Sequence, residues 1–297
     1  MSAVNARQVG LSVGADDARA PRLRRRRTWS PIRLSIAIVL AATYLMPFAF
    51  MFATALKPAD QFLTDPSAWP RSLSLEHFRY AWRNAELGNG LRQSAIAVGI
   101  GVVLCCAICS MAAFWFLRHR GRVASALLAG FGSLWILPQV VWLIPFFLVL
   151  TTLNLTNNIF VLGVVYGTVF APGFIWLLWA YFLQGLPPDI IEAAEIDGAS
   201  LFQQYLRIAL PLSKPALGAV AALTFVFSWG DLLLAVVLLS DPDQFTVVPA
   251  TAILSGRLGS GVQATTAAAI ITMIPPMVIF LIAQKAIVRG ITGGFSK

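Results

Sequence analysis

Three of the four carboxylates in the segment 187–211 lie among small residues. The acids and the small residues beside them are Glu192, Glu195 and Asp197, with Ala193, Ala194 and Gly198. The acids could form ion pairs with a basic partner, and the small residues would allow that partner to approach the backbone closely. The segment therefore looks like a binding surface for another protein, although an ordinary amphipathic loop helix would carry the same residue types.

The rest of the chain offers little for catalysis or metal binding. His77 and His119 are the two histidines, and they fall in loops expected on opposite sides of a membrane. Cys105, Cys106 and Cys109 lie in one apolar block, which lacks the hydrogen-bonding groups that support metal ligands. A G-x-x-x-x-G-K-[ST] phosphate loop is also missing. We expect no catalytic residue and no metal site, and we interpret the cysteines as packing residues.

The composition requires a membrane. Of the 297 residues, 58% are apolar and 12% are charged, against about half and a quarter in a soluble domain. The apolar residues cluster in blocks of about 20 or more, which is the length of a membrane-spanning helix. The net charge of +9 does not indicate nucleic acid, because eight arginines fall in residues 1–33, ahead of the first apolar block.

These blocks predict an all-α membrane protein with six transmembrane helices and cytoplasmic termini. A basic cytoplasmic tail, expected to be disordered, covers residues 1–33, and a cytoplasmic tail covers 287–297. Between them lies a domain over 34–286 with a cytoplasmic loop at 187–211. The expected spans are about 34–56, 93–117, 126–151, 158–183, 214–239 and 263–286. This orientation keeps the excess of basic residues inside.

The ends of two short helices can be predicted within the loop. Pro188 and Asp189 suit a first helical turn. Gly198 can end that helix in the left-handed conformation. Ser200 and Gln203 have the spacing of a capping box, so a second helix should begin at once. The outer segment 57–92, rich in proline and aromatic residues, is expected to be ordered or interfacial, with a solvated loop as the alternative.

The loop resembles a known signature. Glu192-Ala193-Ala194, Gly198, Ile208 and Leu210-Pro211 match E-A-A-x3-G-x9-I-x-L-P, which is typical of permeases in bacterial binding-protein-dependent ATP-binding-cassette (ABC) importers. The chain further resembles the six-span permease of maltose-type carbohydrate importers over about residues 36–295. The matching positions are Leu56-Lys57, Trp69-Pro70, Ile144-Pro145, Leu153-Asn154-Leu155, Asp197-Gly198-Ala199, Trp229-Gly230-Asp231 and Val288 to Gly294. Gly230 and the final Phe295-Ser296-Lys297 depart from that pattern.

The resemblance implies a non-enzymatic permease of the type I ABC importer fold in the bacterial cytoplasmic (inner) membrane. Its implied partners are a second permease in a heterodimer, two copies of an ATPase subunit, an extracytoplasmic substrate-binding protein and the lipid bilayer. This chain would bind no cofactor, because ATP and Mg would be bound by the ATPase subunits. The signature residues, with Asp197 as part of the extended signature, would form the coupling site, and Glu192 is the first candidate to pair with a basic group of the ATPase.

The candidates for the solute pathway are Asp231, Trp229 and Tyr166. Asp231 is a charge inside a predicted span, where burial is costly and function is a common reason for it, although it could instead pair structurally. Trp229 and Tyr166 could stack on a sugar, or they could pack within the bundle. A sugar is the solute that the resemblance implies. Import of another small polar solute and a secondary transporter, which would work without an ATPase, are the alternatives.

Overall fold

A computed structural model describes residues 31–119, 121–256 and 261–293. Residues 1–30 of the expected N-terminal tail and 294–297 of the C-terminal tail lie outside this part. The described residues form helices and no strand. Through the first half they are α1 (Pro31–Leu56), α2 (Ala59–Thr64), α3 (Glu76–Asn84), α4 (Leu87–Arg118), α5 (Arg122–Ile136), α6 (Gln139–Thr152), α7 (Ile159–Val169) and α8 (Ala171–Gly185). Through the second half they are α9 (Pro188–Ile196), α10 (Leu201–Gln204), η1 (Tyr205–Ala209), α11 (Leu210–Leu212), α12 (Lys214–Trp229), α13 (Leu233–Leu238), η2 (Pro242–Gln244), α14 (Val247–Gly256) and α15 (Gly261–Gly293).

The chain divides into two units after Phe48. The described part of the first unit is one apolar helical segment, residues 31–48 of α1, whose side chains are exposed along its length. Pro47 lies inside this helix without ending it. A helix of this length can cross a bilayer, and lipid or a partner helix would cover its exposed apolar side chains.

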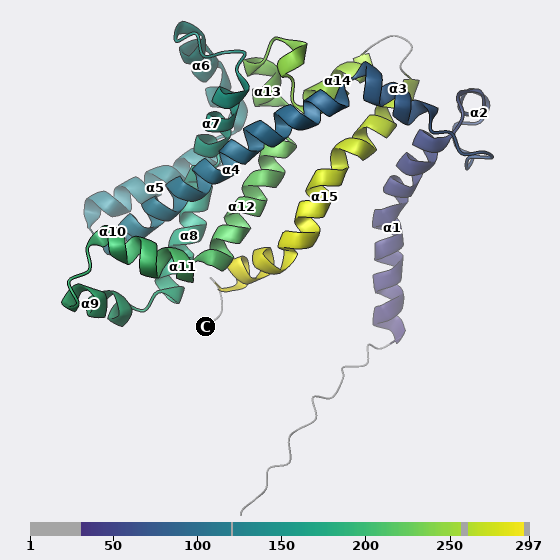
Figure 1. Ribbon diagram of the computed structural model, residues 1–297. Helices are drawn as coiled ribbons and strands as arrows, with labels where there is room; N and C mark the ends of the chain where they lie inside the picture. The colour runs from purple at the N-terminus through teal and green to yellow at the C-terminus, as the bar shows by residue number, and fades with distance from the viewer. Residues whose placement is uncertain (1–30, 120, 257–260, 294–297) are drawn as a thin grey trace, which may run out of the picture. The chain divides into compact units, whose positions relative to one another are not determined.

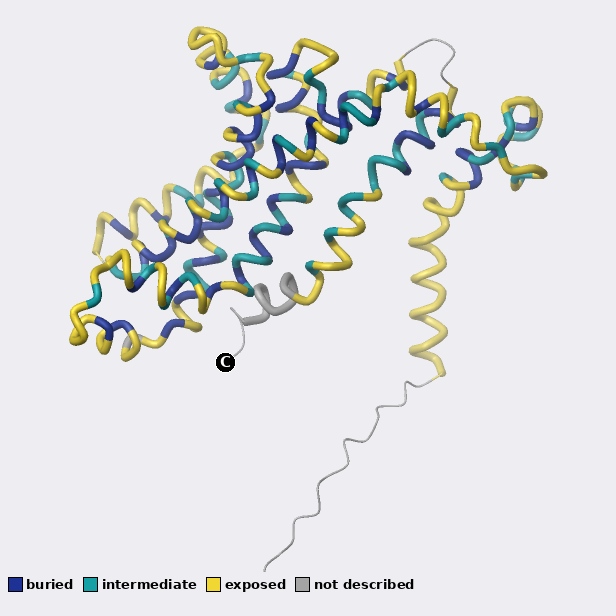
Figure 2. The backbone as a smooth tube through the Cα atoms, in the orientation of Figure 1, coloured by how far each residue is buried: buried dark blue, intermediate teal, exposed yellow. Residues whose placement is uncertain are grey.

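Helix α4 is the central element of the second unit, and it packs against α7, α8 and α12 (Figure 1). Buried residues recur along α4 and α12, whereas exposed residues dominate α9 (Figure 2). Helices α4 and α7 approach closely because each of them has a glycine at the contact. A Cβ on Gly163 would stand 2.9 Å from the backbone oxygen of Ala97, and a Cβ on Gly101 would stand 2.9 Å from the Cβ of Tyr166. Small residues permit such close backbone approach in membrane helices.

Three helix pairs are sharply bent. The angle is 100° between α5 and α6, 45° between α7 and α8, and 76° between the helical segments Leu201–Leu212 and Lys214–Trp229. Pro138, Pro172 and Pro215 each lie at or just after the bend. Proline removes a backbone donor and restricts the residue before it, which explains why regular helix stops there.

Some of the expected spans consist of two helices and not of one continuous helix. The span predicted at 126–151 consists of α5 and α6, and the one predicted at 214–239 consists of α12 and α13 with an interruption at residues 230–232. By length and composition the described residues contain three spanning helices, or up to six if each bent pair is one span. The all-helical class is confirmed, and the count of six spans stays a prediction.

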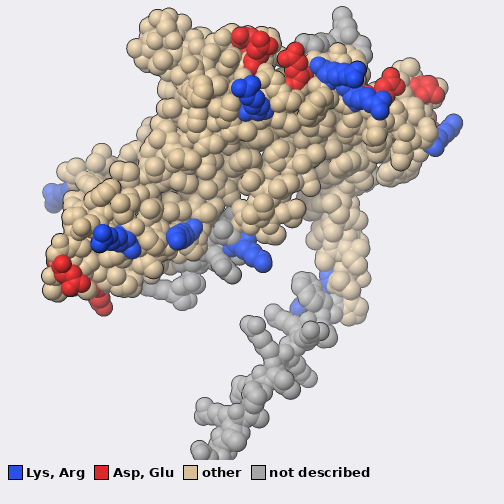
Figure 3. Space-filling model, in the orientation of Figure 1, with Lys and Arg blue, Asp and Glu red and all other residues tan. Residues whose placement is uncertain are grey.

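On the face of the second unit that Figure 3 shows, the charged residues gather toward two ends, with a broad uncharged region between them. One end includes Arg118, the last residue of α4, with its ion-pair partner Glu195. The other end includes Asp243, whose backbone oxygen accepts a hydrogen bond from Gln93 near the start of α4. An uncharged band between two charged rims suits a bilayer, because charged side chains are costly at membrane depth.

The segment after α1 is ordered by its own polar contacts. Lys57 is completely buried, and its Nζ donates hydrogen bonds to the backbone oxygens of Asp65 and Pro66 at 3.3 and 2.7 Å. The side chain of Gln61 donates to the oxygen of Trp69 and accepts from the amide of Arg71. These contacts agree with the expectation that this part of the segment 57–92 is ordered.

The three cysteines lie in an apolar cluster with residues such as Phe174 and Leu178. Cys105 and Cys109 are fully buried, and the thiol of Cys109 lies 3.5 Å from the backbone oxygen of Ala171. This placement agrees with their interpretation as packing residues.

Candidate functional site

The first helix of the signature loop has the predicted ends. Helix α9 begins with Pro188 in its first turn and ends before Gly198, which has φ +76°. The amide of Gly198 donates to the oxygen of Glu195, and the amide of Ala199 donates to the oxygen of Ala194. This pair of bonds is a Schellman motif, which satisfies the last carbonyls of a helix. The predicted glycine stop is confirmed.

The second helix starts as its capping residues predict. The Ser200 hydroxyl accepts from the amide of Gln203, and the Gln203 side chain accepts from the amide of Ser200. Both halves of the capping box are therefore present. The two helices are joined by a turn at Asp197–Ala199, which keeps the loop compact.

Helix α9 has a buried face and an exposed face. Ile191 and Ala194 are buried, at 5% and 8% exposure. Glu192 and Ala193 are exposed, and so is Ile196, at 87%. Asp197 and Gly198 are exposed at the end of the helix. Glu192 and Ala193 of the E-A-A triplet therefore face outward beside the exposed Ile196. Ala194, the second alanine of the triplet, packs inward.

The second half of the signature falls on an irregular helix. Residues Tyr205–Ala209 form a π-helical turn, in which the amide of Leu210 donates to the oxygen of Tyr205. The next residue is Pro211, which has no amide hydrogen to continue the ordinary pattern. Ile208 and Leu210 are half-buried and Pro211 is exposed. Single π-helical turns are frequent at functional sites.

Two polar side-chain contacts among the described residues join the loop to α4. Arg118 at the end of α4 forms an ion pair with Glu195 of α9. Eight residues earlier on α4, the Ser110 hydroxyl lies 2.7 Å from the Tyr205 hydroxyl. The two contacts are separated by about 12 Å along α4 at 1.5 Å per residue. Because both halves of the loop are attached at separate points, neither half can turn freely against α4.

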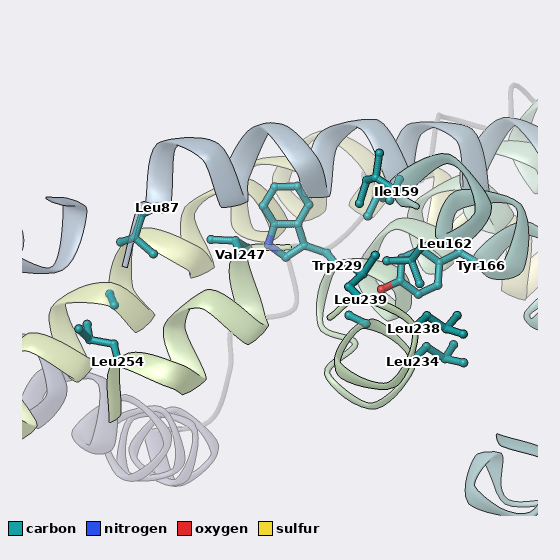
Figure 4. Packing of buried hydrophobic residues seen from close by; sticks show 14 of the residues in the cluster. Leu87, Ile159, Leu162, Tyr166, Trp229, Leu234, Leu238, Leu239, Val247 and Leu254 are labelled. Carbon is teal, nitrogen blue, oxygen red and sulfur yellow. The ribbon is translucent and has the colours of Figure 1, made fainter. Parts of the chain in front are cut away.

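The pathway candidates Asp231 and Tyr166 are brought together by the fold. Asp231 lies in the interruption between α12 and α13, and the Tyr166 hydroxyl of α7 donates to its Oδ2 at 3.1 Å. The amide of Ala235 donates to the same oxygen at 3.1 Å, and the side-chain Nε2 of Gln139 donates to Oδ1 at 3.3 Å. Tyr166 is completely buried, and its hydroxyl is directed toward the segment carrying Leu239 (Figure 4). The carboxylate thus joins helices α6, α7 and α13.

Trp229, the third pathway candidate, lies apart from this cluster. It is 6% exposed, its Nε1 donates to the oxygen of Thr272 at 3.1 Å, and its ring stacks on Phe225 at 5.2 Å. Its indole is packed beneath α4 (Figure 4). In this arrangement Trp229 holds α12 against α15, so stacking on a solute would require it to leave these contacts.

The fold and the loop together define a helical membrane component with a compact loop that exposes one face of α9. Residues 106–293 match the family described as the inner membrane component of binding-protein-dependent transport systems. This match covers more than half of the chain and includes the whole signature loop. The chain belongs to this family, and it is the membrane permease component of an ABC importer.

Curated relatives are similar over nearly their full length. A putative ABC transporter permease of Caldicellulosiruptor is 31% identical over 277 residues, which are 91% of this chain and 97% of that protein. The melibiose/raffinose/stachyose import permease of Bacillus subtilis is 28% identical over 264 residues, covering 88% and 95%. A diacetylchitobiose uptake permease of Streptomyces coelicolor is 26% identical over 272 residues, covering 91% and 97%.

A solved structure shares the fold. A crystal structure of a bacterial ABC transporter involved in import of the polysaccharide alginate superposes with a TM-score of 0.71 at 20% identity, over 87% of this chain and 98% of that one. A second crystal structure, of an alginate ABC transporter in complex with its periplasmic protein bound to an alginate pentasaccharide, superposes with a TM-score of 0.61 at 15% identity, over 84% and 92%. At these identities the likeness establishes the fold alone.

Sequence reasoning missed Arg118 and Gln139. Arg118 lies in a run of basic residues with His119, Arg120 and Arg122, which gives no sign of an acidic partner, and Glu195 is 77 residues away. Gln139 follows Pro138 at the beginning of α6, 92 residues from Asp231. A polar side chain directly after a mid-span proline is the signal that could have singled out Gln139.

Proposed function

We propose that this chain forms half of a translocation pathway for a sugar and that an ATPase subunit drives it through α9. The observation that carries the proposal is the exposed face of Glu192, Ala193 and Ile196 on a helix whose other face is packed. A partner cleft would take the small and apolar residues into close contact, and a basic group there would pair with Glu192.

The complete complex in this proposal has two different permeases, two ATPase subunits and an external binding protein. It lies in the bacterial cytoplasmic membrane, with six spans and with both termini of this chain in the cytoplasm. ATP and Mg are bound by the ATPase subunits. ATP-driven closure of those subunits brings the two coupling helices together and converts an inward-facing cavity into an outward-facing one. The energy for the switch comes from differential binding to the two states.

The sugar assignment is supported by relatives named for import of melibiose, raffinose and stachyose and for uptake of diacetylchitobiose. A second candidate solute class has its own support. A relative from Synechocystis, 30% identical over 289 residues, is named for uptake of osmoprotective compounds. A small polar osmolyte is therefore the alternative to a sugar.

Isolation of the tagged chain in mild detergent tests the assembly. We expect a second permease and an ATPase to copurify with it, and we expect proteoliposomes of that complex to import solute only with ATP and an external binding protein. A chain that purifies alone and transports alone would contradict the proposal and would indicate a secondary transporter. Comparing uptake of melibiose and diacetylchitobiose with uptake of glycine betaine separates sugar import from osmolyte import.

A further inference from the structure

A cavity of about 200 Å³ lies at the bend between α5 and α6. Aromatic side chains form much of its wall, together with apolar residues and one amide. The lining residues include Trp135, Trp142, Phe170 and Gln139. The cavity thus combines flat apolar surfaces with one hydrogen-bonding group, which is the usual make-up of a small-molecule site.

The amide of Gln139 has a fixed orientation. Its Nε2 donates to Asp231 Oδ1 at 3.3 Å, and an ionised carboxylate can only accept. The oxygen Oε1 must therefore be the free end, and it has no partner among the described residues. Asp231 is itself held by Tyr166 and the amide of Ala235. Gln139 lines the cavity, and its amide oxygen is the hydrogen-bond acceptor that this residue has left to offer there.

Three interrupted helices meet at this place. Gln139 follows the break between α5 and α6, Phe170 occupies the break between α7 and α8, and Asp231 lies in the break between α12 and α13. Irregular backbone at membrane depth is tolerated where it is buried in protein or lines a cavity. In many transporters such broken helices surround the solute.

We propose that this cavity is a subsite for one sugar ring, with Gln139 Oε1 accepting from a sugar hydroxyl and the aromatic side chains packing against the faces of the ring. Asp231 is a positioning residue that acts through Gln139. The inference rests on the proposed function, because it assumes that the solute is a sugar. A positioning role also gives a reason for Asp231 inside the bundle, where both of its carboxylate oxygens already accept hydrogen bonds from protein groups.

The residue types favour a sugar over a lipid chain. A sugar ring has apolar C–H faces and hydroxyl donors on its edge, and both match what the cavity offers. An acyl chain would leave Gln139 Oε1 without a partner in an apolar site, which is costly. A groove formed by Met111, Phe114, Phe202 and their neighbours at the end of α4 has the apolar walls that an acyl chain would suit.

Uptake kinetics of the complete reconstituted importer test the subsite. The variants are Gln139→Leu, which keeps the size and removes the acceptor, Trp142→Ala, and Trp142→Phe as the conservative change. Gln93→Leu is the matched control, because Gln93 is an amide on α4 that donates to Asp243 O, away from the cavity. The probes are melibiose and diacetylchitobiose, with ATP hydrolysis stimulated by the binding protein measured in parallel.

We expect Gln139→Leu and Trp142→Ala each to lower kcat/KM for sugar uptake about 2- to 10-fold, the value of one hydrogen bond or one aromatic contact. Stimulated ATP hydrolysis should be kept, and Trp142→Phe and Gln93→Leu should remain near wild type. Normal sugar uptake by both cavity variants would overturn the subsite and leave the proposed function standing. An equal loss of uptake and ATP hydrolysis would also overturn it, since the residues would then act in folding. If the wild-type complex imports neither sugar, the sugar assignment and the subsite fail together.

Discussion

Arg118 at the end of α4 is paired with Glu195 of α9, so the helix at the centre of the bundle is joined to the helix that we propose receives the ATPase. The side chains are 25% and 44% exposed. An ion pair this exposed contributes about 0–1 kcal/mol to stability. Its main effect is therefore expected on the orientation of α9.

Reversal of the two charges tests this relationship. Arg118→Glu and Glu195→Arg should each reduce the solute imported per ATP hydrolysed several-fold, because α9 would move without carrying α4 with it. The double variant restores the pair and should recover most of the loss. Thermal stability of the complex should change little in all three. Absence of recovery in the double variant would argue that the two residues act separately.

Gly198 should tolerate asparagine better than alanine. At φ +76° a non-glycine residue is strained by about 1–2 kcal/mol, although asparagine adopts this conformation more readily. A Cβ at Gly198 would meet nothing within 4 Å, so backbone strain is the only cost. Gly198→Ala should therefore weaken copurification of the ATPase more than Gly198→Asn. Equal copurification by both would contradict the role of the glycine stop.

The close approach of α4 and α7 predicts a stability effect far from the loop. Gly163→Ala forces a methyl group against Ala97 O and the side chain of Ile100. Overpacking of this kind costs about 1–3 kcal/mol, so the melting temperature of the purified complex should fall. Gly130→Ala is the matched control, because a Cβ there meets nothing within 4 Å. A drop of the same size in the control would remove the packing explanation.

The expected topology is measurable by thiol labelling. In a background lacking Cys105, Cys106 and Cys109, Ser240→Cys should react with an impermeant maleimide added to intact cells or spheroplasts. Gly121→Cys should react only after the membrane is opened. Both positions are exposed in the structure. The reverse pattern would place the signature loop outside and would rule out contact with a cytoplasmic ATPase.

Local features of the loop were predictable because short-range chemistry controls them. Gly198, Ser200 and Gln203 act on backbone groups within a few residues, so spacing alone located both helix ends. Proline predicted the ends of helices less well. Helix stops before Pro138 and bends near Pro172, but it continues through Pro145 and through Pro275 and Pro276. A membrane helix can contain proline where neighbouring groups satisfy the backbone carbonyls that it leaves free.

Contacts between distant residues were not predictable in the same way. Asp231 stood out as a charge in an apolar block, but its partners Tyr166 and Gln139 depend on how α6 and α7 pack around it. Arg118 and Glu195 both had plausible solvent-exposed roles when considered alone. Periodicity and spacing carry no information on which of many loop charges will meet, since that is set by the fold.

The most direct test of the account is the coupling ratio of Glu192→Ala in the reconstituted importer. Glu192 is expected to pair with a basic group of the ATPase in a desolvated cleft, and removal of one partner from a buried pair costs about 3–5 kcal/mol. Asp189→Ala, another exposed acid on the same helix, is the matched control. We predict that Glu192→Ala inserts normally but loses most uptake and most stimulation of ATP hydrolysis, while Asp189→Ala keeps both. Full uptake and full stimulation in Glu192→Ala would contradict the claim that the ATPase acts through this face of α9.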